Sequence, residues 1–208
     1  MHNPALAARN DLLNTESAFE VLHRARALEA EGRDIVHLEI GQPDFPTPPH
    51  ITDAALRAIH DGATGYAPTV GIPELREAVA EHTAASRGVA VDADRVVVTP
   101  GAKPIMFFSV LACVEAGDEV IYPNPGFPIY ESVIRFVGAK PVPLPLREEL
   151  GFRFDPDELR ELVTAKTRMM IVNSPGNPTG GVLGATELDA IAELATERRV
   201  WVLSDEVY

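Results

Sequence analysis

Two polar side chains near the end of the sequence each follow an apolar run. Asn177 comes after the run 169–173 and a Ser-Pro-Gly turn, and Asp205 ends the run 201–204. A carboxylate at the end of a buried strand is costly unless a cation or good hydrogen bonds satisfy it. No basic residue lies beside Asp205 in the sequence. We therefore expect a ligand or a distant residue to satisfy this carboxylate.

A third polar segment, Thr99 to Pro104, joins an apolar run to an amphipathic stretch. Pro104 suits the first turn of a helix, and the N–H groups and dipole at a helix N-terminus favour an anion. A phosphate would fit at Gly101, Ala102 and Lys103. Taken alone, a tight turn that uses glycine for backbone freedom is the simpler interpretation. No glycine fingerprint for dinucleotides or nucleoside triphosphates occurs in the sequence.

The elements that hold these segments alternate between short apolar runs and longer amphipathic stretches. This pattern predicts an α/β fold in which a mostly parallel sheet is covered by helices on both faces and ligands bind at the carboxyl ends of the strands. The predicted strands are 96–99, 119–122, 141–144, 169–173 and 200–204, and the predicted helices are about 103–115, 127–137, 156–164 and 185–198. Upstream we predict an arm to about residue 14, a helix from Ser17, a strand at 35–40 and helices at about 49–60 and 72–86.

The composition excludes several classes of function. The chain has 208 residues, 46% of them hydrophobic, which is enough to form a hydrophobic core. Its net charge of -13 disfavours nucleic acid as a partner. Its single cysteine, Cys113, cannot form an internal disulfide or a zinc site, and this favours the reducing cytoplasm. The six histidines lack metal-ligand spacing, so no metal is expected. No apolar run is long enough for a membrane span.

Six motifs in order resemble the N-terminal half of the fold type I, class I/II aminotransferases that use pyridoxal 5'-phosphate. They extend over about four-fifths of the chain, and together they are far more specific than any one alone. The resemblance implies an arm and the start of a small domain in residues 1–45 and an incomplete coenzyme-binding large domain in residues 46–208. The motifs are Gly41 to Phe45, Tyr66 to Pro68 with Gly71 to Arg76, Gly101 to Lys103, Asn124 to Tyr130, Asn173 to Gly180, and Ser204 to Tyr208.

The resemblance implies roles for four residues around the coenzyme ring. Asp205 would pair with the pyridine nitrogen and keep it protonated, so that the ring withdraws electrons from the substrate. Asn177 and Tyr208 would donate hydrogen bonds to the phenolate oxygen of the ring, and Asn177 would also line the substrate site. Phe127 would stack on the ring face, where relatives often carry Trp or Tyr.

The resemblance also assigns the phosphate and the substrate carboxylate. The backbone groups of Gly101, Ala102 and Lys103 would hold the phosphate, and Tyr66 resembles a tyrosine that reaches the phosphate of a neighbouring subunit. Gly41 would line the pocket for the substrate carboxylate. Without the resemblance, Tyr66 and Phe127 would be assigned to ordinary packing, because most aromatic side chains pack in cores or on surfaces.

The Schiff-base lysine of these enzymes has no match in this sequence. The only lysines are Lys103, Lys140 and Lys166, and none stands at the family position, which the resemblance places beyond Tyr208. We therefore expect an N-terminal fragment that has no catalytic residue of its own, is inactive alone and exposes apolar surface that promotes aggregation.

The full-length protein would transfer an amino group between an L-amino acid and a 2-oxo acid, as a homodimer. Three alternatives share most of these residues: a carbon–sulfur lyase, a cyclopropane-carboxylate synthase, and a domain that binds the coenzyme without catalysis. The identity of the amino donor cannot be read from this half of the enzyme.

Overall fold

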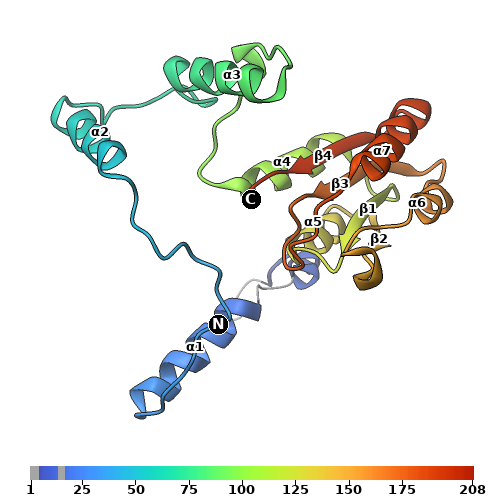
Figure 1. The fold of residues 1–208 in the computed structure, drawn as a ribbon, viewed down its shortest axis with the longest axis horizontal. Coiled ribbons are helices and arrows are strands. Elements are labelled where there is room, and N and C mark those ends of the chain that lie inside the picture. The colour runs from blue at the N-terminus through green and yellow to red at the C-terminus, as the bar shows by residue number, and fades with distance from the viewer. Residues whose placement is uncertain (1–4, 14–16) are drawn as a thin grey trace. The chain divides into compact units, whose positions relative to one another are not determined.

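The computed structural model describes residues 5–13 and 17–208, which Figure 1 draws as a ribbon, and its internal contacts divide the chain into two units. The first unit combines Met1–Glu16 with Gly101–Tyr208, and the second is Ser17–Pro100. The predicted division into residues 1–45 and 46–208 concerns the domains of a complete enzyme and stays a prediction.

A parallel sheet forms the centre of the first unit. Its strands are β1 (Glu119–Asn124), β2 (Lys140–Pro145), β3 (Thr167–Asn173) and β4 (Trp201–Asp205), and they lie in the order β2-β1-β3-β4. All three neighbouring pairs are parallel. The carboxyl ends of the strands therefore meet at one end of the sheet, where the register sets Asn173 beside Asp205.

Helices cover both faces of this sheet. One face packs against α4 (Ala102–Cys113) and α5 (Ile129–Phe136), and the other against α6 (Pro156–Leu162) and α7 (Ala185–Arg198). Side chains alternate along β1, because Val120 and Tyr122 enter the α4 and α5 core while Ile121 enters the α6 and α7 core. The predicted parallel sheet with helices on both faces is confirmed. Two 3-10 turns, η1 (Ala8–Leu12) and η3 (Glu148–Leu150), complete this unit.

The two outer strands of the sheet differ in chemistry. In β2, the N–H groups at the flanks of the strand point to β1, since Lys140 donates to the Asp118 carbonyl and Leu146 to the Asn124 carbonyl, both at 2.8 Å. The prolines alternate with these positions, so their missing N–H groups fall on the outer edge. On β4, by contrast, Trp201 and Val202 are 60% and 41% exposed. Apolar surface is thus exposed on β4 as expected, while aggregation stays a prediction.

The second unit consists of helices joined by extended segments. It contains α1 (Ser17–Ala30), α2 (Pro49–His60), α3 (Pro73–Arg87) and the 3-10 turn η2 (Ala93–Arg95). Both α2 and α3 begin with proline, which suits the first helical position. Among the described residues, no helix is long and apolar enough to cross a membrane.

Two predicted strands, 35–40 and 96–99, are wrong. Neither segment forms a strand in the structure. Val98 donates one hydrogen bond to the Val70 carbonyl at 2.9 Å, and the Val96 carbonyl accepts one from Arg76 Nε at 2.9 Å. These are isolated contacts rather than a ladder, and β-branched residues form a strand only where a neighbouring strand pairs with them.

Candidate active site

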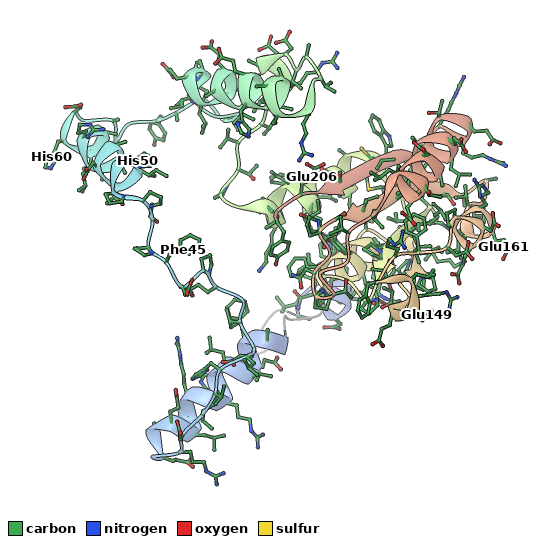
Figure 2. All side chains as sticks on the ribbon, in the orientation of Figure 1. Phe45, His50, His60, Glu149, Glu161 and Glu206 are labelled. Carbon is green, nitrogen blue, oxygen red and sulfur yellow. The ribbon has the colours of Figure 1, made fainter. Side chains whose placement is uncertain are left out.

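A pocket opens at the carboxyl end of the sheet, between the start of α4 and the end of β4. Its volume is about 230 Å³. Asp205 and Ala102, two of the predicted site residues, both line it. Glu206, labelled in Figure 2, directly follows β4 and also lines this pocket. The remaining lining residues are Ile105, Met106, Tyr130, Leu203, Ser204 and Val207.

Asp205 is held by neutral hydrogen-bond donors. The Tyr130 hydroxyl donates to Asp205 Oδ2 at 2.8 Å, and the Val207 N–H donates to Oδ1 at 3.3 Å. Tyr130 is only 1% exposed. Burial first, and the Asp205 carboxylate second, raise the pKa of Tyr130 far above its usual range. The tyrosine therefore stays a neutral donor, and within residues 5–13 and 17–208 no ion pair joins Asp205 to a cation.

One buried amide, that of Asn173, links two predicted site residues. Asn173 Nδ2 donates to the Asp205 carbonyl at 3.1 Å, and Asn173 Oδ1 accepts from the Asn177 N–H at 2.7 Å. Asn173 ends β3 beside Asp205, so the first bond follows from the strand register, while the second closes the local turn from Asn173 to Asn177. The loop that carries Asn177 is thereby tied to the end of β4.

The α4 N-terminus forms the other side of the pocket. Gly101 adopts φ 94°, a left-handed conformation that suits glycine, and directs the chain into the helix at Ala102. Lys103 Nζ lies 5.9 Å from the centre of the Phe127 ring, and this ring meets Tyr130 edge-on at 5.8 Å. Phe127 thus connects the helix N-terminus with the residue that holds Asp205.

The structure brings together most of the predicted site residues in the first unit. Contacts link Lys103, Phe127, Asn177 and Asp205 through Tyr130 and Asn173 as described above. Tyr208 belongs to the same unit, and its side chain is exposed. The functions predicted for all of these residues stay predictions.

Two other predicted site residues, Tyr66 and Gly41, belong to the second unit. Both are exposed there. Their predicted contacts with the phosphate of a neighbouring subunit and with the substrate carboxylate stay predictions.

Tyr130 and Asn173 were part of sequence motifs but were not assigned to the site from sequence. Tyr130 lies three residues after Phe127, just inside α5, and this nearness to a predicted site residue is the available signal. Asn173 gave a weaker signal, a polar residue at the end of an otherwise apolar run. Both residues form hydrogen bonds with predicted site residues, and Tyr130 also lines the pocket.

Metal ligation finds no support in the part of the chain that the structure describes. No group of three or more His, Cys, Asp or Glu side chains is arranged to hold a metal ion. His50 and His60, both labelled on α2 in Figure 2, lie at opposite ends of that helix.

Comparisons with known proteins identify the family. The family model for aminotransferase class I and II matches residues 33–208. A probable aspartate/prephenate aminotransferase of Aquifex aeolicus is 41% identical over 98% of this chain and 52% of its own length. The solved aspartate aminotransferase of Thermus thermophilus with maleate has a TM-score of 0.95 at 39% identity, over 99% of this chain and 54% of its own.

An alanine aminotransferase of Pyrococcus furiosus has a TM-score of 0.93 at 33% identity, over 98% of this chain and 52% of its own. The chain therefore spans about half the length of the relatives it matches. The family model alone covers well over half of the chain. The chain belongs to the family of class I and II aminotransferases.

Proposed function

We propose that this chain forms the coenzyme-binding half of a pyridoxal 5'-phosphate-dependent aminotransferase. The single observation that carries the proposal is the position of Asp205, which is held by neutral donors in a pocket shared with a helix N-terminus. Such a pocket offers an anion to one end of a ligand and a positive helix dipole to the other.

The Asp205 side of the pocket fits a protonated ring nitrogen. A carboxylate that receives only hydroxyl and amide donors retains its capacity to accept from a cationic N–H group. Its neighbours Leu203 and Val207 are apolar, and a bound ring would shield the carboxylate from water and so strengthen the attraction between opposite charges. Asp205 would keep the bound pyridine ring protonated.

The α4 side of the pocket fits a phosphate. The N–H groups of the first helical turn point out of the helix end, and the helix dipole adds positive potential there. Ala102 has a short side chain that leaves room for an anion to approach the backbone. Lys103 adds a formal positive charge beside the Phe127 ring. Phosphate at this end and ring nitrogen at the other match the two ends of the coenzyme.

The bound coenzyme would supply an electron-withdrawing ring that stabilises negative charge on the substrate carbon. The residues of this chain would bind and orient it: Asp205 at the ring nitrogen, Asn177 and Tyr208 at the ring oxygen, and Phe127 against the ring face. The complete protein would transfer an amino group between an L-amino acid and a 2-oxo acid. Transamination is favoured over carbon–sulfur elimination because the relatives named above are all called aminotransferases.

The assembly and cellular location belong to the same proposal. The predicted contact of Tyr66 with a neighbouring subunit implies a homodimer, in which Gly41 would line the pocket for the substrate carboxylate. The single cysteine favours the reducing cytoplasm.

Binding of pyridoxamine 5'-phosphate tests the proposal directly. This compound carries the ring nitrogen and the phosphate and needs no lysine for attachment. Its fluorescence on titration with residues 1–208 should change saturably, with one site per chain, and inorganic phosphate should compete. No saturable binding by the folded chain would contradict the proposal.

Two matched variants test the phosphate end. Ala102→Asp puts a carboxylate on the first residue of α4, where it suits the helix dipole but repels a phosphate, so affinity should fall about tenfold or more. Ala185→Asp makes the same change on the first residue of α7 and should leave affinity unchanged. Equal affinity in both variants would contradict the assignment of the phosphate to the α4 N-terminus.

The complete gene product tests the reaction. Supplied with amino acids and a 2-oxo acid, it should form the exchanged amino acid and 2-oxo acid in equal amounts. Release of ammonia together with a sulfur-containing leaving group would favour the lyase instead.

A further inference from the structure

We propose that Tyr130 is a positioning residue that fixes the Asp205 carboxylate for its contact with the ring nitrogen of the coenzyme. This inference rests on the proposed function and adds a residue to its site. The observation that carries it is the 2.8 Å hydrogen bond from the Tyr130 hydroxyl to Asp205 Oδ2, which joins residues 75 positions apart in the sequence.

Tyr130 itself has little freedom to move. Its ring belongs to the buried core between the sheet and helices α4 and α5, and the Phe127 ring packs against it edge-on. It stands in the first turn of α5, whose backbone is fixed by the helix. The hydroxyl oxygen on such a ring has a fixed position, and this makes it a suitable donor to hold a carboxylate in place.

The two oxygens of Asp205 are held unequally. Oδ2 receives the short bond from the buried tyrosine, whereas Oδ1 receives a long bond of 3.3 Å from the Val207 N–H. Oδ1 therefore retains acceptor capacity in the pocket that Asp205 lines. Fixing Oδ2 fixes the plane of the carboxylate and with it the direction in which Oδ1 accepts.

The chemistry of a tyrosine suits this position better than that of a cationic residue. Burial and the nearby carboxylate keep the Tyr130 hydroxyl protonated. It can therefore orient Asp205 without neutralising it, and the negative charge stays available to a protonated ring. A lysine or arginine in its place would form an ion pair and compete with the ligand.

A second tyrosine in the same core provides a matched control. Tyr122 is buried in the cluster that contains Tyr130, but its hydroxyl interacts with Glu131 rather than with Asp205. Tyr122→Phe and Tyr130→Phe thus each remove one hydroxyl from the same core. Only the second removal affects Asp205.

The test measures the affinity of residues 1–208 for two probes. One is pyridoxamine 5'-phosphate, and the other is the same compound with carbon in place of the ring nitrogen. Tyr130→Phe should weaken binding of the first about tenfold and leave binding of the second unchanged. Tyr122→Phe should change neither affinity. Near-ultraviolet circular dichroism confirms that each variant is folded.

The outcomes separate this inference from the function on which it rests. If the unaltered chain fails to bind pyridoxamine 5'-phosphate, the proposed function falls, and the inference with it. If the unaltered chain binds but Tyr130→Phe weakens both probes equally, Tyr130 serves only the fold and the inference alone is overturned. Unchanged affinity of Tyr130→Phe for both probes overturns it as well.

A double substitution provides an independent check on the same variant. In an Asp205→Asn background, Tyr130→Phe should cause no further loss of affinity, because its effect passes through the carboxylate. Additive losses would show that Tyr130 acts by another route and would overturn the inference.

Discussion

Two carboxylates at opposite ends of the same sheet have different partners. Glu119 begins β1 at the amino end, is 7% exposed, and accepts hydrogen bonds from Lys140 Nζ at 2.8 Å and Thr164 Oγ1 at 2.7 Å. Asp205 ends β4 at the carboxyl end and accepts from the Tyr130 hydroxyl and the Val207 N–H. One charge has a cationic partner in the chain, and the other has neutral donors.

This difference separates a structural group from a candidate functional one. The Glu119 charge is compensated by Lys140, so nothing further is needed at the amino end of the sheet. The Asp205 charge is oriented but not compensated by any ion pair in the described part of the chain. A carboxylate that lines a pocket in this state favours a cationic group on a ligand, and the carboxyl ends of parallel strands are where ligands commonly bind.

Removing the charge at each end should affect different properties, and the largest effect is expected at Asp205. Asp205→Asn keeps the shape but loses the charge, so affinity for pyridoxamine 5'-phosphate should fall about 100-fold, as expected for a desolvated charge pair. Glu119→Gln is the matched control and should leave that affinity unchanged. Fluorescence titration measures the affinity of each variant. Equal affinities would contradict the assignment of a functional role to Asp205 and a structural one to Glu119.

For folding stability the order should be reversed, with Glu119→Gln losing more than Asp205→Asn. Glu119→Gln weakens two hydrogen bonds to a charged group, but Lys140 is largely exposed, so we expect a loss of only about 1 kcal/mol in the free energy of unfolding. Asp205→Asn should change this free energy less. Urea unfolding followed by far-ultraviolet circular dichroism compares them.

The stability due to Glu119 should also depend on pH. The hydrogen bond from Lys140 first, and that from Thr164 second, lower the pKa of Glu119 below its usual 4.5. A lowered folded-state pKa means that the stabilisation is complete above the unfolded value and is lost as the pH falls through the folded one. The difference between the unaltered chain and Glu119→Gln should therefore shrink below about pH 4. A constant difference at all pH values would show that the charge of Glu119 is not involved.

The sequence predicted the sheet unit well because each of its strands is a short apolar run between amphipathic helices. The runs at 96–99 and 35–40 have the same local pattern but form no strand, since pairing depends on a neighbour that local sequence does not specify. The sequence also placed Ala102 and Asp205 in one site, and both line the same pocket. The functions of its motif residues stay predictions, and the tyrosine that donates to the Asp205 side chain lies 75 positions away, a relation that spacing along a chain does not encode.

A smaller effect on coenzyme affinity is expected from Asn173, whose side-chain amide contacts the end of β4 and the loop that carries Asn177. Asn173→Ala removes the bonds to the Asp205 carbonyl and the Asn177 N–H, so coenzyme affinity should fall about threefold to tenfold as the two residues lose their common support. Asn124→Ala is the matched control, because Asn124 ends the neighbouring strand β1 and is exposed. Its affinity should be unchanged. Equal losses in both variants would mean that Asn173 has no special part in the site.

The smallest effect is expected at an exposed histidine, His37, that lies within hydrogen-bond distance of two carboxylates. In the second unit, His37 Nδ1 lies 2.6 Å from Glu39 Oε1 and His37 Nε2 lies 2.8 Å from Glu29 Oε1. These hydrogen bonds, that to Glu39 first, raise the pKa of His37 above 6.5. The contact between α1 and the segment around His37 should therefore be complete below about pH 6.5 and weaken as the pH rises through the raised value.

Because the cluster around His37 is exposed, salt should screen this effect, in contrast to that at Glu119. Amide hydrogen exchange of residues 36–40, corrected for the intrinsic dependence on pH, should speed up modestly across this range in the unaltered chain. The His37→Gln variant should lack that change. If both chains showed the same pH response, that response would come from another titratable group. His37 would then have no part in it, and only Glu119 and Asp205 would remain to be compared.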